Sequence, residues 1–110
     1  MLFIVWFKVN QPESMSQKQI YEIWMRESEE APKIVNRENV VTGPYKVAGK
    51  QEIMTIVNFE SLQELDSTFS KLPILKELGH SVKIEILPIY PIPDFIQQVE
   101  DTLQEGMISK

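Results

Sequence analysis

The sequence contains no cysteine and a single histidine, His80. A chain without cysteine has no disulfide, no thiol nucleophile and no thiolate metal site, which fits the reducing conditions of a cytoplasm. One histidine excludes a metal site built from several histidines of the same chain. We therefore expect a cytoplasmic protein without a bound metal, and we interpret His80 as a loop residue.

Basic residues are also in the minority, with 11 basic against 16 acidic residues and a net charge of −5. The lysines are scattered, so no basic patch offsets the repulsion from a phosphate backbone, and we expect no nucleic-acid partner. The apolar N-terminal run lacks a basic leader and is much shorter than the ~20 residues that span a bilayer. We expect no membrane segment and interpret this run as a strand.

Extended and helical patterns alternate along the chain, whose 43% hydrophobic content suffices for one core. Residues rich in β-branched and aromatic side chains predict strands at 2–9, 40–48, 53–59 and 82–89. Apolar residues at helical spacing predict helices at about 16–36 and 61–72. The order β-α-β-β-α-β is that of an α+β ferredoxin-like sandwich, with an antiparallel four-stranded sheet and both helices on one face.

Local signals predict the ends of these helices. Ser16 with Gln19, and Ser61 with Glu64, have the spacing of capping boxes. Proline removes a backbone donor and clashes one turn back, so we expect Pro32 to kink or break the first helix. The second helix has an apolar stripe that Pro73 is expected to end. The stripe consists of Leu62, Leu65, Phe69 and Leu72.

The end of the chain predicts a separate helix, capped by Asp94. Its apolar residues share one face, and they are Phe95, Ile96, Val99 and Leu103. We therefore divide the chain into a ferredoxin-like domain at residues 1–92 and a C-terminal helical extension at residues 93–110.

Both faces of the first strand are apolar. Leu2, Ile4 and Trp6 point to one face, and they alternate with residues that point to the other face and are also apolar. Two helices cover only one face of the sheet. The other face would expose a larger apolar area than the few hundred Å² usual for the apolar patches of monomers. The cover is either a second subunit's sheet, packed face to face as in a dimeric α+β barrel, or the C-terminal helix on its own or a neighbour's sheet. We favour a homo-oligomer through the sheet face, as a dimer or larger assembly.

Glu27 is the candidate catalytic residue because it interrupts the apolar pattern of the first helix. The apolar residues there fall within an arc of about 100°, and Glu27 is the charged residue inside that arc. Burial among apolar groups would raise its pKa toward neutrality, which suits a general acid or base. The alternative is a structural carboxylate at the rim of the sheet that reaches water or pairs with a lysine.

The candidate substrate-binding residues are Trp24 on the first helix and Tyr45, Lys46 and Lys50 on the predicted hairpin. A cation there would hold a carboxylate or stabilise an enolate oxygen. The alternatives are ordinary surface lysines and a core tryptophan. Gly49 is expected to supply the positive φ of the turn, and the Ala-Gly-Lys sequence lacks the glycine spacing of a phosphate loop.

Several short motifs occur in the order found in a known family. They are "MLFIV" at the start, Pro12, Met15, Glu27, Ala31, "RE" at 37–38, "YKVAG" at 45–49, Phe59 and "KLP" at 71–73. Over roughly residues 1–92 the chain resembles the muconolactone delta-isomerase family. The resemblance implies a cofactor-free ferredoxin-like protein that assembles through its sheets and moves a proton along the conjugated framework of an unsaturated lactone.

The resemblance places Glu27 at an acidic position of the family's first helix. Family enzymes carry histidine where this chain has Ile4 and Lys50. Lysine stays charged near neutral pH, so it binds anions better than it transfers protons. Our hypothesis is that Glu27 transfers a proton while Lys50, Lys46 or Tyr45 binds the anionic end of a small lactone or cyclic acid.

Two other classes of protein use the same scaffold. One is a non-catalytic small-molecule binder or oligomeric assembly module. The other is a cofactor-free monooxygenase-like enzyme, because a fold of this type hosts several chemistries.

Overall fold

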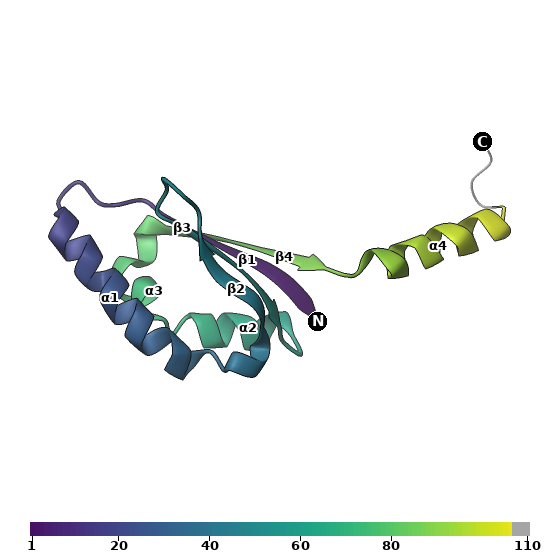
Figure 1. The fold of residues 1–110 in the computed structure, drawn as a ribbon, viewed down its shortest axis with the longest axis horizontal. Helices are drawn as coiled ribbons and strands as arrows, with labels where there is room; N and C mark the ends of the chain where they lie inside the picture. Colours follow the sequence, from purple (N-terminus) through teal and green to yellow (C-terminus); the bar gives the residue numbers. More distant parts are fainter. Residues whose placement is uncertain (107–110) are drawn as a thin grey trace.

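The computed structural model describes residues 1–106, in which a four-stranded sheet carries helices on one face (Figure 1). The strands are β1 (Leu2–Val9), β2 (Val40–Lys46), β3 (Glu52–Asn58) and β4 (Val82–Ile89). The helices are α1 (Gln17–Ile34), α2 (Leu62–Phe69), α3 (Pro73–Leu78) and α4 (Ile92–Gln104). Short 3-10 turns at Arg37–Asn39 and Gly79–Ser81 precede β2 and β4.

The sheet is antiparallel with the strand order β2-β3-β1-β4. At its centre Val5 of β1 lies opposite Thr55 of β3 and Ile86 of β4. The predicted ferredoxin-like α+β fold is confirmed, with α1, α2 and α3 on the same side of the sheet (Figure 1).

Alternate residues of β1 place one face of the sheet in the core. Phe7 and its neighbours two residues apart are buried, and they pack with Ile20 of α1 and Leu65 of α2. The Phe69 ring of α2 lies 5.7 Å from that of Phe7 and packs edge-on against Phe59 at 5.9 Å. Each such buried side chain contributes about 1.5–3 kcal/mol, so this layer dominates the stability of the fold.

The first helix begins as predicted and ends slightly earlier. Both bonds of the Ser16–Gln19 capping box are present, at 3.2 and 2.8 Å. Of the kink or break predicted at Pro32, the break does not occur, because α1 continues to Ile34 and the Val35 N–H still donates to the Ala31 carbonyl. Proline in the last turn removes one helical donor, and here the remaining bonds hold that turn.

The second helical segment differs more from the prediction. The helix ends at Phe69, and Pro73 begins α3 as its first residue, where the missing N–H costs nothing. Ser61 accepts a hydrogen bond from the Glu64 N–H at 3.1 Å, but the return bond of a capping box is absent. Leu62, expected in the apolar stripe, is exposed.

The C-terminal helix also starts differently. It begins at Ile92 after Pro91, and Asp94 lies in its first turn instead of capping it. Pro93 suits that first turn because the N–H groups there have no helical partner. None of the helices in the described part of the chain is long and apolar enough to cross a membrane.

Two glycines shape the β2–β3 hairpin. Gly49 has the predicted positive φ of 76° in the turn, and β2 ends at Lys46, two residues earlier than expected. Gly43 has a φ of 97° and precedes Pro44 in a cis peptide, where the β2–β3 register shifts. The sequence reading missed this irregularity, which carries Gly43 toward the interior.

Replacing Gly43 with alanine is expected to destabilise the protein more than replacing Gly49. Both changes force a side chain into a positive φ, at about 1–2 kcal/mol. A Cβ at Gly43 would also lie 3.1 Å from the Met54 carbonyl oxygen and 3.2 Å from Thr55 Oγ1, whereas one at Gly49 meets nothing within 4 Å. Urea unfolding of both variants measures the difference, and equal losses would contradict the tight packing at Gly43.

Candidate functional site

A cavity of about 520 Å³ lies between α1 and the helix-covered face of the sheet. Its walls come from α1, the sheet and the segments around α2 and α3. The lining is mostly apolar and includes Phe7, Trp24, Ala31, Pro32, Val35, Val40, Ile53, Val57, Phe69 and Leu72. Glu27 and Arg37 are the charged residues among the described residues that line it. An apolar cavity with few polar groups is typical of small-molecule sites.

Glu27 lies on the inner face of α1 and is only 9% exposed. Its Oε1 accepts a hydrogen bond of 2.9 Å from the backbone N–H of Ile74, in the first turn of α3. Within residues 1–106, every side-chain oxygen or nitrogen that is sealed from solvent has a hydrogen-bond partner. The second oxygen, Oε2, has no such bond and is therefore not sealed from solvent, and Glu27 is one of the residues that line the cavity.

The pKa of Glu27 is raised above its ordinary value. The main cause is burial, which removes water from the charged form, and the hydrogen bond from the Ile74 N–H partly opposes it. A carboxylate in this state accepts a proton more readily than one in water. Glu27 thus has the environment that suits a general base.

Arg37 lines the same cavity from the 3-10 turn that follows α1, and it is exposed. Two contacts hold this turn: Asn36 Oδ1 accepts from the Glu38 N–H at 3.1 Å, and Asn39 Nδ2 donates to the Asn58 carbonyl at 2.8 Å. No side-chain hydrogen bond or ion pair of the guanidinium occurs within residues 1–106. Arg37 is therefore a cation available to an anionic ligand, and the sequence reading had assigned it no role.

Trp24 is half-buried and lines the cavity together with Glu27, and its role in substrate binding stays a prediction. Its indole Nε1 donates to Gln51 Oε1 at 2.6 Å, which links α1 to the hairpin. Trp24 also lines a second hollow of about 440 Å³, so it belongs to the walls of both spaces.

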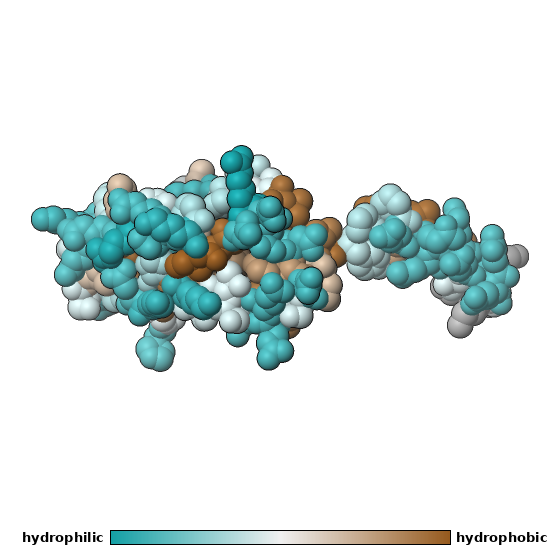
Figure 2. All heavy atoms as spheres, turned by 90° about the horizontal axis from the view of Figure 1, so that it is seen from below, coloured by the Kyte–Doolittle hydropathy of each residue, from teal (hydrophilic) through white to brown (hydrophobic). Residues whose placement is uncertain are grey.

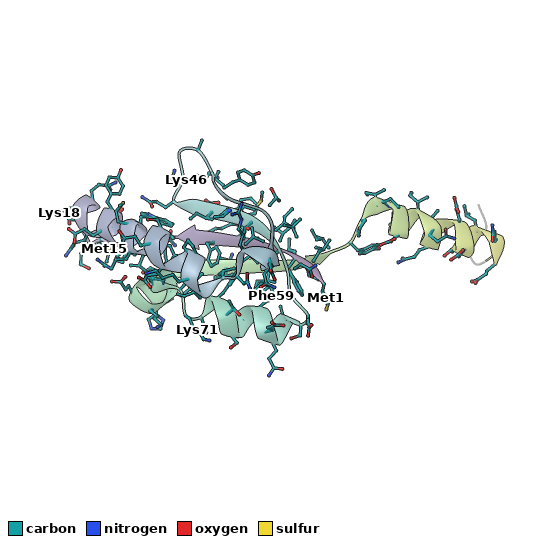
Figure 3. The ribbon with its side chains drawn as sticks, turned by 60° about the horizontal axis from the view of Figure 1, so that its bottom comes forward. Met1, Met15, Lys18, Lys46, Phe59 and Lys71 are labelled. Atoms are coloured by element: carbon teal, nitrogen blue, oxygen red, sulfur yellow. The ribbon has the colours of Figure 1, made fainter. Side chains whose placement is uncertain are left out.

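The hairpin residues lie away from Glu27 within one copy. Lys46 and Lys50 line the second hollow with Tyr21 and Trp24, and Figure 3 shows Lys46 on the hairpin. Tyr45 is exposed, and its hydroxyl is hydrogen bonded to Thr42 Oγ1 at 2.9 Å. None of these three residues lines the larger cavity. Their role in substrate binding stays a prediction.

Acidic residues and the histidine do not gather into a metal site. Within the described residues, no group of three or more His, Asp or Glu side chains could hold a metal ion.

Comparison with known families shows where this arrangement belongs. The model of the family described as muconolactone delta-isomerase matches residues 1–94. The chain belongs to the muconolactone delta-isomerase family. Glu27, Arg37 and the whole cavity fall within the matched region, whereas most of α4 lies beyond it.

One solved structure shares the fold of this chain, and a second is less similar. A crystal structure of muconolactone isomerase has a TM-score of 0.63 and 22% identity, over 83% of this chain and 90% of that one. The dehydrochlorinase of 5-chloro-2-hydroxyhydroquinone from Burkholderia phenoliruptrix AC1100, in complex with 2,5-dihydroxybenzoquinone, has a TM-score of 0.48 and 21% identity, over 77% and 91%. At such identities the likeness concerns the fold. A search of curated proteins gave no significant match.

The variant Glu27→Gln is expected to gain stability relative to the wild type as the pH rises, so that the difference between their unfolding free energies grows. A group whose folded pKa is raised stabilises the fold below its unfolded pKa, and this contribution is lost as the pH rises through the folded pKa. Glutamine does not titrate, so the difference in unfolding free energy should grow from pH 4 to pH 8, by about 1.4 kcal/mol per unit of pKa difference.

Urea unfolding at a series of pH values measures this difference. The control is Glu30→Gln, since Glu30 is an exposed residue of the same helix whose ion pair with Lys33 spans 3.5 Å. If the unfolding free energy of Glu27→Gln relative to the wild type falls as the pH rises, the Ile74 hydrogen bond has a larger effect on the pKa of Glu27 than burial has.

Proposed function

We propose that this protein is a cofactor-free isomerase that moves a proton within a small unsaturated lactone or cyclic acid. The observation that carries the proposal is a buried carboxylate, Glu27, which lines an apolar cavity of about 520 Å³ and keeps one oxygen without a hydrogen bond. Membership of the muconolactone delta-isomerase family supports the reaction class.

Glu27 would act first as a base and then as an acid. Its Oε2 takes a proton from the saturated carbon attached to the far end of the conjugated C=C bond, and the electron pair of that C–H bond moves through the double bond toward the carbonyl oxygen. The protonated Glu27 then returns the proton to a different carbon, and the double bond shifts with no net change in atoms or charge. The Ile74 N–H holds Oε1 during both steps, so the oxygen that exchanges the proton keeps its orientation.

Arg37 would bind the carboxylate of the substrate at the edge of the cavity. A guanidinium presents two parallel donors to a carboxylate, which fixes orientation as well as charge. Trp24 would pack on the apolar ring. The cation also lowers the energy of negative charge that develops on the substrate when Glu27 removes the proton.

Lys46, Lys50 and Tyr45 keep a proposed role in binding the anionic end of the ligand. Both lysines line the second hollow, to which Trp24 also contributes. Their charges would attract an anionic ligand toward the neighbouring cavity in a chain whose overall charge is negative. We further propose that the protein acts in the cytoplasm as a homo-oligomer assembled through the open face of its sheet.

A second candidate function is a non-catalytic small-molecule binder. It is favoured by the contact between Glu27 and the Ile74 N–H, because this contact gives the buried carboxylate a structural reason to be there. A binder would be stabilised by lactones without converting them.

The variant Glu27→Gln is expected to lose at least 100-fold in kcat on an unsaturated lactone, with muconolactone as the first compound to assay. General acid–base groups contribute about 10²–10⁴ in rate, and glutamine keeps the shape while losing the exchangeable proton. The wild-type rate should rise with pH through a pKa above that of an ordinary glutamate, and this limb should vanish in the variant. Steady-state kinetics across pH measure both effects.

Glu30→Gln is the matched control and should keep wild-type kcat, since Glu30 lies outside the cavity. Full activity of Glu27→Gln would remove this residue from the mechanism. Thermal stabilisation by lactones without turnover in the wild type would select the binder.

Arg37→Gln is expected to raise KM by at least 10-fold with a smaller change in kcat, because it removes the charge that holds the substrate carboxylate. Arg37→Lys should recover part of the affinity, since it restores charge without the paired donors. The control Arg26→Gln removes another arginine, one that pairs with Glu77 at 2.6 Å outside the cavity. An unchanged KM in Arg37→Gln would place the carboxylate elsewhere.

A further inference from the structure

The cavity that Glu27 lines is larger than a lactone ring requires. An apolar cavity of about 150 Å³ holds one benzene ring, whereas the volume here is about 520 Å³. Its wall follows α1 from Trp24 to Pro32, over about 12 Å at the helical rise per residue. A lactone ring with its carboxylate therefore leaves room for a further group on the same molecule.

Most side-chain donors around the cavity are engaged within the protein. Ser28 and Thr55 donate their hydroxyl hydrogens to backbone carbonyl groups at 2.7 and 3.0 Å. The Trp24 indole N–H donates to Gln51 Oε1 at 2.6 Å. Among the described residues that line the cavity, Arg37 is the side chain whose donors are free. A ligand therefore finds side-chain hydrogen-bond donors at one position of the wall.

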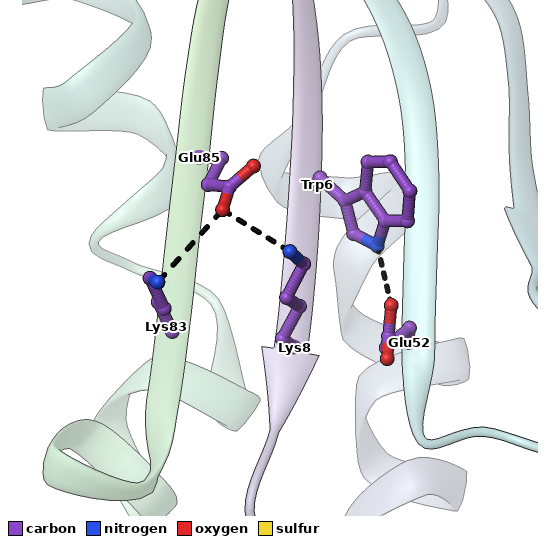
Figure 4. Close-up of polar contacts among 5 residues, drawn as sticks. All are labelled: Trp6, Lys8, Glu52, Lys83 and Glu85. Atoms are coloured by element: carbon purple, nitrogen blue, oxygen red, sulfur yellow. Dashed lines mark hydrogen bonds and ion pairs between the residues drawn. The ribbon is translucent and has the colours of Figure 1, made fainter.

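Arg37 is also the cation of the cavity wall within residues 1–106. Two lysines of the sheet pair elsewhere, since Lys8 and Lys83 lie 3.1 and 3.9 Å from the Glu85 carboxylate (Figure 4). They lie on the opposite face of the sheet, because Lys8 alternates with the core residues of β1 and is paired with Lys83 across β4. One guanidinium binds one carboxylate, so the cavity suits a ligand with a single anionic group.

The inner wall of the cavity is apolar and buried. Its residues come from the sheet and from the segments of α2 and α3, are 0–6% exposed, and consist of Phe7, Val57, Phe69, Leu72 and Ile74. On the helix side of the molecule, hydrophobic residues also reach the surface between hydrophilic ones (Figure 2). Burial of an apolar group against the inner wall is favourable, whereas a second charge there would lose its hydration without gaining a partner.

We propose that the substrate is an unsaturated lactone with one carboxylate and an alkyl or aryl substituent on its ring. The carboxylate binds Arg37, the reacting carbons lie at Glu27, and the substituent packs on the inner wall. A substituent on the ring carbon between the two that lose and gain the proton leaves both of them free to react. This substrate class rests on the proposed function and narrows it.

Binding of unreactive analogues tests the substrate class. Saturated analogues of muconolactone lack the C=C bond, and the series carries hydrogen, propyl or pentyl at that middle ring carbon. Each methylene that enters the cavity should lower Kd about four-fold. We expect the propyl compound to bind at least ten-fold more tightly than the unsubstituted one, and the pentyl compound more tightly again, in isothermal titration calorimetry. Equal or weaker binding of the substituted compounds would overturn the proposal.

A charged version of the longest analogue tests the requirement for a single anionic group. It carries a second carboxylate at the end of its pentyl chain. We expect it to bind at least ten-fold more weakly than the pentyl compound, because the inner wall offers no cation to a second charge. Equal affinity of the two compounds would show that the chain does not enter an apolar space, and the proposal would fail.

A variant that fills the cavity tests where the substituent lies. Ala31 follows Glu27 by one turn of α1 and lines the cavity, so Ala31→Leu occupies part of the space. The ratio of the Kd of the unsubstituted compound to that of the pentyl compound should fall at least ten-fold. The control Ala48→Leu makes the same change at an exposed residue outside the cavity and should keep the wild-type ratio. Equal ratios in the two folded variants would place the substituent elsewhere and overturn the proposal.

Turnover is measured separately, with the unsaturated members of the series. Graded binding of the saturated compounds without turnover of any unsaturated one would overturn the isomerase and support the ligand class. Turnover of muconolactone, together with no gain in affinity from the substituents, would support the isomerase and overturn the substrate class.

Discussion

The hydrogen bond from the Ile74 N–H to Glu27 Oε1 joins α1 to α3 across 47 residues of sequence, and the cavity depends on it. Without this donor a buried carboxylate would bear the full loss of its hydration, and without the carboxylate the first turn of α3 would lack a side-chain cap. The contact therefore has two consequences. It closes one wall of the cavity that Glu27 lines, and it leaves Oε2 as the carboxylate oxygen without a hydrogen bond.

The rest of the cavity follows from how the core is built. Phe7 and Phe69 belong to the packed layer between sheet and helices and also line the cavity, so its walls are as rigid as the core itself. On the opposite side, the irregular part of β2 brings Gly43 close to Thr55, whose hydroxyl donates to the Thr42 carbonyl at 3.0 Å. A site whose walls are core side chains holds its carboxylate in place without a mobile loop.

The sequence predicted the features that depend on periodicity and missed those that depend on tertiary placement. Glu27 was found because its position in a 3.6-residue repeat defines the face it lies on. Arg37 was missed because it follows the end of α1, where no repeat relates the position of a side chain to the core. Its "RE" motif entered only the family resemblance. The helix α3 was missed because a proline such as Pro73 is compatible with both the end of one helix and the start of another.

The strands give the molecule two independent surfaces, because successive side chains of a strand point to opposite faces. In β1, Phe7 lines the cavity and its neighbour Trp6 lies on the open face, where Glu52 accepts its indole N–H. Substitutions on the open face therefore change side chains that do not line the cavity. The family's matched region ends near the start of α4, and no residue of this helix lines the cavity.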